Sequence, residues 1–115
     1  MKIEVEQLKQ FYYEYVGKIP NGLSVIVQLF QISDYESALH NLGNFAEGLE
    51  SLLTIEEKLA EQGFFINSRI QEATVIFEKI NRKLEDKQYK LLSNLLKEQL
   101  IPIFSSATEW QFSRQ

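Results

Sequence analysis

The sequence contains a single histidine, His40, with a glutamate, Glu36, four residues before it. On a helix this spacing places both side chains on one face, where an imidazole and a carboxylate are able to share a metal ion. A di-iron site in a helical bundle needs two Glu-x-x-His pairs and further carboxylates, which one histidine at another spacing does not supply. The chain also has no cysteine, which excludes disulfides, thiol nucleophiles and cysteine metal sites. We therefore expect no metal, no cofactor and a surface position for His40.

A second group able to do chemistry is a row of four carboxylates on one helix face. Paired carboxylates serve as acid and base only where burial or crowding separates their pKa values. This row lies away from the apolar positions of its segment, so we expect it to be solvated. The five glycines are scattered, no phosphate-binding loop is present, and nothing resembles a nucleophile elbow, so we predict that the protein is not an enzyme. The row consists of Glu47, Glu50, Glu57 and Glu61.

Five basic residues cluster between residues 79 and 90, and a basic patch is the electrostatic footprint of nucleic-acid binding. Acidic residues interrupt the cluster, the formal net charge is −4, and no helix-turn-helix or stacking-aromatic signature accompanies it. Residues 1–62 carry 10 acidic and 4 basic side chains, whereas residues 63–115 carry 6 and 8, so the two halves should attract each other. We therefore predict a solvated face or an internal ion-pair partner, not a nucleic-acid site. The cluster consists of Lys79, Arg82, Lys83, Lys87 and Lys90.

Aromatic residues crowd both ends of the chain, and they supply the candidate partner-binding residues. Near the first end, four of them fall within five positions, so one helix cannot direct all of them to a single core. Exposed tyrosine and tryptophan are favoured at protein interfaces because they bury a large area at low entropic cost. In an antiparallel bundle the two ends meet, and the aromatic groups then form either one partner-binding patch or a cap in which they bury one another. The candidate partner-binding residues are Phe11, Tyr12, Tyr13, Trp110 and Phe112.

The elements that must position these residues follow from a 4-3-4-3 spacing of apolar residues that occurs four times. Such a period places one face of each helix against a partner helix. We therefore predict a single domain over residues 1–115: an all-α, antiparallel up-down four-helix bundle in which prolines disturb the first and last helices. The second series has one charged member, Glu56. The first series is Leu8, Tyr12, Tyr15, Ile19, Gly22, Ile26 and Leu29, and the weaker fourth series is Leu92, Leu96, Gln99, Ile103, Ser106 and Trp110.

The first hairpin is expected to begin with a helix over residues 3–31. Pro20 lies inside it and costs about 3 kcal/mol in a helix interior, but the apolar period runs through it in phase, which favours one kinked helix over two. Ser33 and Glu36 have the spacing of a capping box, which predicts the start of the second helix. This helix should end just before Gly63. Two glycines inside it are either tolerated or allow a close helix approach: Gly43 and Gly48.

The second hairpin is less sharply marked. Its first helix is expected to start between residues 64 and 68 and to end near residue 85. A short link at residues 86–88 leads to the last helix, in which Pro102 introduces a second kink or break. We expect residues 113–115 to be frayed.

The two hairpins resemble each other at an offset of 54 residues. This offset aligns Tyr35 with Tyr89 and Leu42 with Leu96, and it superposes the two links. Either a duplicated hairpin or a chance match between two amphipathic hairpins produces such a pattern.

Two segments of the chain look familiar together. The first is FQISD at residues 30–34 followed by FAEGL at residues 45–49, and the second is EDKQYKLL at residues 85–92 followed by LIP and Trp110. Together they resemble a family of small uncharacterised helical-bundle proteins from Firmicutes bacteria, over about residues 20–110. In that family a tryptophan often follows the Glu-Gly-Leu segment, where this chain has leucines. The resemblance implies a bacterial cytosolic bundle and brings no activity, cofactor or catalytic residue with it.

The sequence does not determine a specific function. Acidic residues stand where a signal peptide needs an apolar run, and no apolar stretch approaches the roughly 20 residues of a membrane span, so we expect a soluble cytoplasmic protein without membrane contact. The leading hypothesis is a non-catalytic protein-protein interaction module, either an adaptor or a chaperone-like bundle that holds a helix of another protein. The alternatives are a self-associating structural homodimer and a small-molecule-binding bundle, for which only Gln99 and Ser106 offer interior polar groups.

Overall fold

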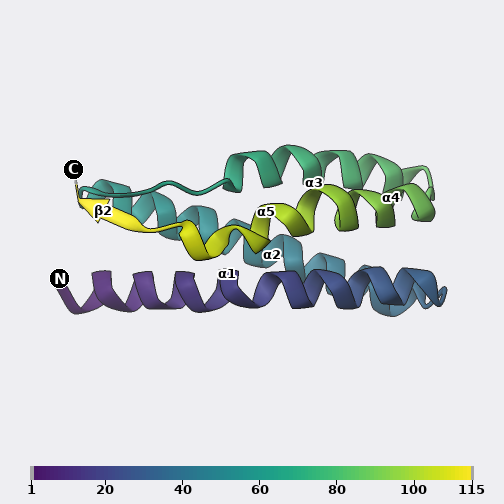
Figure 1. Ribbon diagram of the computed structural model, residues 1–115, viewed down its shortest axis with the longest axis horizontal. Helices are drawn as coiled ribbons and strands as arrows, with labels where there is room; N and C mark the ends of the chain where they lie inside the picture. The colour runs from purple at the N-terminus through teal and green to yellow at the C-terminus, as the bar shows by residue number, and fades with distance from the viewer. Residues whose placement is uncertain (1, 115) are drawn as a thin grey trace.

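The computed structural model describes the backbone of residues 2–114 and the side chains of residues 5–114. The molecule is elongated, 46 × 21 × 20 Å, with helices along its long axis and a pair of short strands at one end (Figure 1). The mostly helical fold predicted from the sequence is confirmed, and the strands are an addition. The elements are α1 (Lys2–Gln31), α2 (Tyr35–Glu61), β1 (Phe64–Ile66), α3 (Ile70–Glu85), α4 (Tyr89–Leu95), the π-helical segment η1 (Leu96–Leu100), α5 (Ile101–Ser105), the 3-10 segment η2 (Ala107–Glu109) and β2 (Phe112–Arg114).

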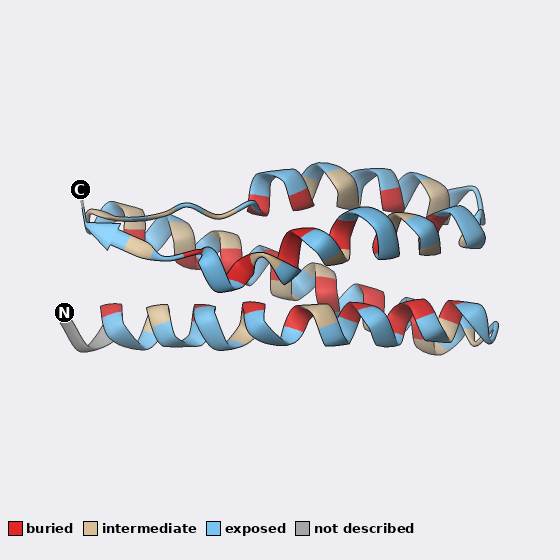
Figure 2. Ribbon diagram, in the orientation of Figure 1, coloured by how far each residue is buried: buried red, intermediate tan, exposed pale blue. Residues whose placement is uncertain are grey.

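The longest helix, α1, is the central packing element. It contacts α2 on one side and α4 and α5 on another, while α3 packs mainly on α4 and η1. Figure 2 shows buried residues along the inner sides of the helices and exposed residues along their outer sides. Within the described part of the chain every buried side chain is apolar or aromatic, so the interior is a hydrophobic core.

α1 runs through Pro20 without interruption, as the in-phase apolar period predicted. Because proline has no N–H, the carbonyl of Val16 loses the helical donor that residue 20 would supply. Pro20 is only half-buried, so water has access to this part of the helix, and packing on α2 and α5 keeps α1 continuous.

The buried face of α1 differs from the predicted series. Tyr12 and Ile19 are buried as predicted. Gly22, however, is exposed, and Tyr15 and Leu29 are only half-buried. The reason is that α1 packs against α4 and α5 as well as α2, which turns a different face of the helix toward the core. The buried face consists of Val5, Tyr12, Val16, Ile19, Leu23, Ile26, Val27 and Phe30.

The link between α1 and α2 is not the predicted capping box. Ser33 adopts a left-handed conformation, with φ 63°, and the N-cap is Asp34, whose carboxylate accepts a hydrogen bond from the N–H of Ser37 at 3.3 Å. The predicted cap at Ser33 with Glu36 as its partner is therefore wrong. The physical reason is the way in which α1 ends. The N–H of Asp34 donates a hydrogen bond to the carbonyl of Leu29, and this turn needs Ser33 in the left-handed conformation, so Ser33 does not serve as the N-cap of α2.

The link between α3 and α4 repeats this geometry 54 residues later. Lys87 is left-handed, with φ 56°, and the N–H of Gln88 bonds to the carbonyl of Lys83 at 2.9 Å. Tyr35 and Tyr89, the first residues of α2 and α4, stack with their ring centroids 4.3 Å apart. The alignment of the two links in the sequence is thus matched by a shared turn geometry.

The third helix begins later than predicted, because residues 64–66 form β1. Phe64 and Ile66 pack against the core while Phe65 is exposed. This alternation is the two-residue period of a strand, and the apolar run was too short to separate it from the start of a helix.

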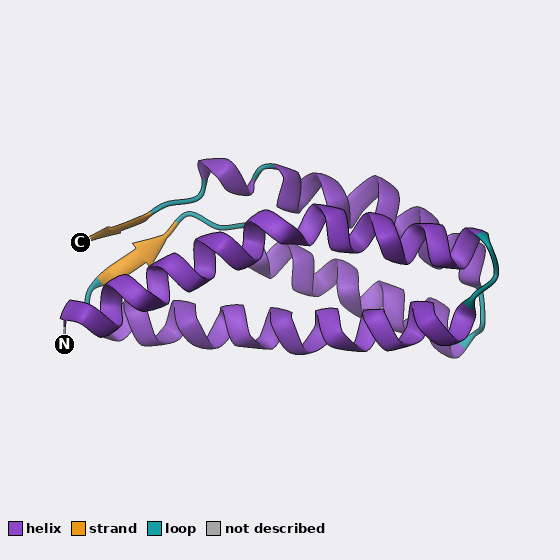
Figure 3. Ribbon diagram, turned by 90° about the horizontal axis from the view of Figure 1, so that it is seen from below, coloured by secondary structure: helices purple, strands orange, loops and turns teal. Residues whose placement is uncertain are grey.

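β2 pairs antiparallel with β1 at the end of the molecule where both chain ends lie (Figure 3). The side-chain oxygen Oδ1 of Asn67 accepts a hydrogen bond from the N–H of Gln111 at 2.9 Å and so extends the contact beyond the strands. The predicted fraying of residues 113–115 is therefore wrong for the first two of them, and Gln115 lies outside the described residues.

Pro102 does not end the last helical stretch, which continues through it to the end of α5. The helix instead widens just before it, where the N–H of Ile101 bonds to the carbonyl of Leu96, five residues back. Proline lacks an N–H and its ring needs room beside the preceding turn, which the wider π turn provides. The disturbance predicted at Pro102 thus takes the form of a local widening.

Candidate protein-interaction surface

The residues singled out for metal or acid–base chemistry all lie on the surface. His40 and Glu36 are exposed, as are the four carboxylates of α2. Within the described residues, no group of three or more histidine, aspartate or glutamate side chains is close enough to hold a metal ion.

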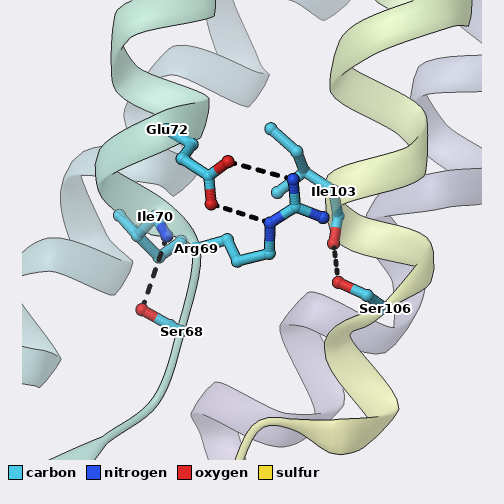
Figure 4. Close-up of polar contacts among 6 residues, drawn as sticks. All are labelled: Ser68, Arg69, Ile70, Glu72, Ile103 and Ser106. Atoms are coloured by element: carbon cyan, nitrogen blue, oxygen red, sulfur yellow. Dashed lines mark hydrogen bonds and ion pairs between the residues drawn. The ribbon is translucent and has the colours of Figure 1, made fainter.

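The ion pairs among the described residues are both local. Lys9 pairs with Glu6 at 3.6 Å, and Arg69 pairs with Glu72 three residues later. The Arg69 guanidinium donates two hydrogen bonds to the Glu72 carboxylate, at 2.7 and 3.0 Å, which holds the pKa of that carboxyl below its ordinary value (Figure 4). No described ion pair joins residues 1–62 to residues 63–115, so the expected attraction between the halves produces no direct contact between charges.

The aromatic residues at the two chain ends separate into distinct groups. Tyr12 and Phe112 meet edge to face with centroids 5.1 Å apart, and the hydroxyl of Tyr13 accepts a hydrogen bond from the N–H of Phe112 at 2.9 Å. Trp110 packs instead on Phe104, 5.8 Å away. The expected meeting of the two ends is therefore observed for three of the five candidates.

The five aromatic candidates differ in how much of each side chain is accessible to a partner. Tyr12 is 0% exposed and Trp110 is also buried, so neither side chain presents surface to a partner, and the expectation that they do is corrected. Phe11 and Tyr13 remain exposed, and Phe112 is half-buried. A partner-binding role for these three residues stays a prediction.

The Tyr12 hydroxyl belongs to a polar contact that the sequence did not identify. It donates a hydrogen bond to Oε2 of Glu56 at 2.5 Å, and the hydroxyl of Ser68 donates to the same oxygen at 2.8 Å. Burial, with the Glu56 carboxylate second, raises the pKa of Tyr12 above its ordinary value. We call these three residues the Glu56 hub; it joins α1, α2 and the segment before α3. The sequence feature that pointed to this contact was Glu56 itself, because it is the one charged member of an apolar series.

The Glu56 hub links three segments of the chain. The phenol of Tyr12 is buried, and one carboxylate oxygen of the half-buried Glu56, Oε2, accepts both hydrogen bonds. The interior polar groups proposed for ligand binding are also unavailable, because Gln99 is exposed and the hydroxyl of Ser106 donates to the carbonyl of Ile103 at 2.6 Å (Figure 4).

A cleft of about 480 Å³ lies beside the terminal aromatic group. Tyr13, Val16 and Pro20 of α1 form one wall, and the segment from Phe104 to Phe112 forms the other. Most of the lining is apolar, and the carbonyl freed by Pro20 belongs to the α1 wall. Because Tyr13 and Phe112 bond across the mouth, we interpret this region chiefly as the cap of the molecule.

A second apolar stripe of α1 faces outward along most of the helix. Its members repeat the 4-3-4-3 spacing of the core but are rotated by about 100° from it, as the 3.6-residue helical period allows. Phe11, Val25 and Ile32 are 53%, 47% and 71% exposed. Other large apolar side chains are also exposed, among them Val75 on α3, which is 54% exposed. We call these residues the outer stripe: Phe11, Tyr15, Lys18, Gly22, Val25, Leu29 and Ile32.

The outer stripe has a hollow of about 290 Å³ at its middle, between α1 and α2. Lys18, Gly22 and Val25 line it from α1, and Asn41 and Asn44 line it from α2. No atom lies within 4 Å of the position that a Cβ of Gly22 would take, so this part of the surface is open.

Tyr15 closes the side of the outer stripe toward α2. Its ring stacks on Phe11 with centroids 6.1 Å apart, and its hydroxyl lies against the backbone of Gly48, where a Cβ would collide with it. Burial raises the pKa of Tyr15. Of the two alternatives for the glycines of α2, Gly48 permits a close approach of Tyr15 from α1, whereas Gly43 faces open space and is tolerated.

Comparison with known proteins identifies one family. Residues 7–109 match the model of a domain of unknown function, DUF8042, and because the match covers most of the chain, the protein belongs to this family. No curated protein and no solved structure matches the chain. Among the described residues, none of the helices combines the length and the apolar character needed to cross a membrane.

Proposed function

We propose that this DUF8042 protein is a non-catalytic protein-protein interaction module that binds an amphipathic helix of another protein along the outer stripe. One observation carries the proposal: a stripe with the 4-3-4-3 spacing of a helix interface, with Phe11, Val25 and Ile32 exposed, on a helix whose other apolar face, about 100° away, is already buried in the core. A partner helix docks on such a stripe through anchors spaced by three and four residues.

The dimensions of the outer stripe suit a helix. From Phe11 to Ile32 it extends over 21 residue steps, about 32 Å at 1.5 Å per residue, or roughly two thirds of the 46 Å length of the molecule. Its three exposed large apolar members are Phe11 and Val25, which lie 14 residues apart on α1, and Ile32, which follows 7 residues later, directly after the end of α1. The hollow at Gly22 gives room for one large side chain of the partner.

The non-catalytic part of the proposal rests on the state of the titratable groups. The carboxylate row of α2 is exposed, and Oε2 of Glu56 accepts two hydrogen bonds, which supports the absence of an acid–base pair poised at a cleft among the described residues. Of the five aromatic candidates, we place Phe11 in the docking surface and assign Tyr13 and Phe112 to the cap.

The proposal also covers the order of the helices, the location of the protein and its source. We propose that the helices run in antiparallel up-down order, because short turns link α1 to α2 and α3 to α4. We also propose a cytoplasmic location, which the absence of cysteine supports, and a bacterial source, which rests on the resemblance to Firmicutes proteins.

The test is a capture experiment with two matched valine variants. Val25 in the outer stripe and Val75 on α3 are both helical and about half exposed, so an aspartate at either place should leave the fold intact. Tagged wild-type protein and Val75→Asp should retain the same stoichiometric partner from a lysate of the source organism, and Val25→Asp should lose it. Equal retention by both variants, or equal loss, would overturn the proposed site.

A further inference from the structure

The outer stripe contains one charged residue, Lys18, which lines the hollow beside Gly22. No described carboxylate lies within ion-pair distance of Lys18, and its neighbours across the hollow, Asn41 and Asn44, are uncharged. A helix that covers the stripe therefore covers a lysine that has no ion-pair partner among the described residues.

Covering such a lysine has a definite electrostatic consequence. Removing an ammonium group from water without a counter-charge is unfavourable, whereas a carboxylate placed opposite it restores the interaction. A single polar position inside an apolar interface also fixes the register and orientation of the two helices. Lys18 thus favours one class of partner helix over purely apolar ones.

We propose that the partner is an amphipathic helix with an aspartate or glutamate inside its apolar face, positioned opposite Lys18. This inference rests on the proposed function of the outer stripe as a docking surface. Next to the acid, the partner presents a large apolar side chain that fills the hollow at Gly22. Further apolar residues, spaced by three and four, cover Phe11 and Val25.

A second copy of this chain fits the surface poorly. All seven positions of the outer stripe lack an acidic residue, so a pairing of two stripes supplies no carboxylate to either copy of Lys18. A lysine that is covered without a counter-charge disfavours the pairing. The charge pattern therefore points to a different protein as the occupant, and not to a homodimer through this face.

The test uses three synthetic helical peptides of about 28 residues, or four heptads. They share one 4-3-4-3 apolar face and differ only in its central residue, which is Glu, Gln or Lys. Their affinities are measured against the wild-type protein, Lys18→Glu and a control, Lys97→Glu, which changes an exposed lysine of η1 outside the stripe. Val25→Asp reports whether binding occurs at the stripe.

Wild type and Lys97→Glu should bind the Glu peptide about tenfold more tightly than the Lys peptide, and Lys18→Glu should reverse this preference. The preference should shrink as the salt concentration rises. If wild type binds all three peptides equally and Val25→Asp abolishes binding, the acidic partner is refuted and the docking surface stands. If no peptide binds in a manner sensitive to Val25→Asp, both the inference and the proposed site are refuted.

Discussion

Replacing Gly48 by alanine should destabilise the protein, whereas the same change at Gly43 should stabilise it. Both glycines lie inside α2, where alanine is favoured over glycine by about 1 kcal/mol. They differ in their surroundings. A Cβ at Gly43 meets no atom within 4 Å, but a Cβ at Gly48 collides with the ring and hydroxyl of Tyr15.

The size of the expected stability change follows from the contacts that the Tyr15 ring loses when a Cβ is added at Gly48. To make room, its ring has to leave the half-buried position between α1 and α2 and its stack on Phe11, which costs about 2 kcal/mol. Gly48→Ala should therefore be less stable than the wild type by about 1 kcal/mol, and Gly43→Ala more stable by up to about 1 kcal/mol. The two variants should differ by about 2 kcal/mol.

Urea unfolding followed by circular dichroism measures this difference as a shift in midpoint at constant slope. A double-mutant cycle supplies the mechanism: in a Tyr15→Ala background the penalty of Gly48→Ala should disappear. Equal stability of Gly43→Ala and Gly48→Ala, or a penalty that persists without Tyr15, would refute the close approach of α1 to Gly48.

Three further substitutions test the Glu56 hub and the first turn. Glu56→Gln should lower the free energy of unfolding by about 1–2 kcal/mol because two hydroxyl donors lose an ionised acceptor, whereas exposed Glu57→Gln should stay within about 0.5 kcal/mol of wild type in urea unfolding. Burial raises the pKa of Tyr12 above its ordinary value of 10.0, so the neutral phenol contributes fully to stability below pH 10. Above pH 10 the unfolded chain loses the phenol proton first, and this contribution falls as the pH rises. In thermal melts above pH 10, the stability of Tyr12→Phe should therefore fall less steeply with pH than that of the wild type. Asp34→Ala should cost about 1 kcal/mol and Ser33→Ala much less, and the reverse order would restore the capping box predicted at Ser33.

The helical elements were predictable because their signals are long. The apolar period through Pro20 identified one continuous α1, and the in-phase series located most of the core of α2. The rotation of the buried face of α1 was not predictable, since it depends on α4 and α5 packing beside α2. β1 and β2 were missed because three residues carry too little periodicity to distinguish a strand from a helix end.

The candidate surface was predicted only in part. Phe11 was among the five candidate partner-binding residues, whereas Val25 and Ile32 belonged neither to these candidates nor to the apolar series. A single helix with two apolar stripes does not reveal from sequence which stripe is buried, because both have the same spacing. Tyr12 and Trp110 were placed both in the apolar series and among the candidate partner-binding residues, because aromatic crowding does not distinguish a buried cap from an exposed interface.

The location of binding tests the central claim most directly. Isotope-labelled protein titrated with the Glu-centred peptide should show backbone NMR shift changes at Phe11, Lys18, Val25 and Ile32, with Val75 on α3 unaffected. Changes confined to Tyr13 and Phe112 at the terminal cleft, or to α3, would contradict the outer stripe as the docking surface.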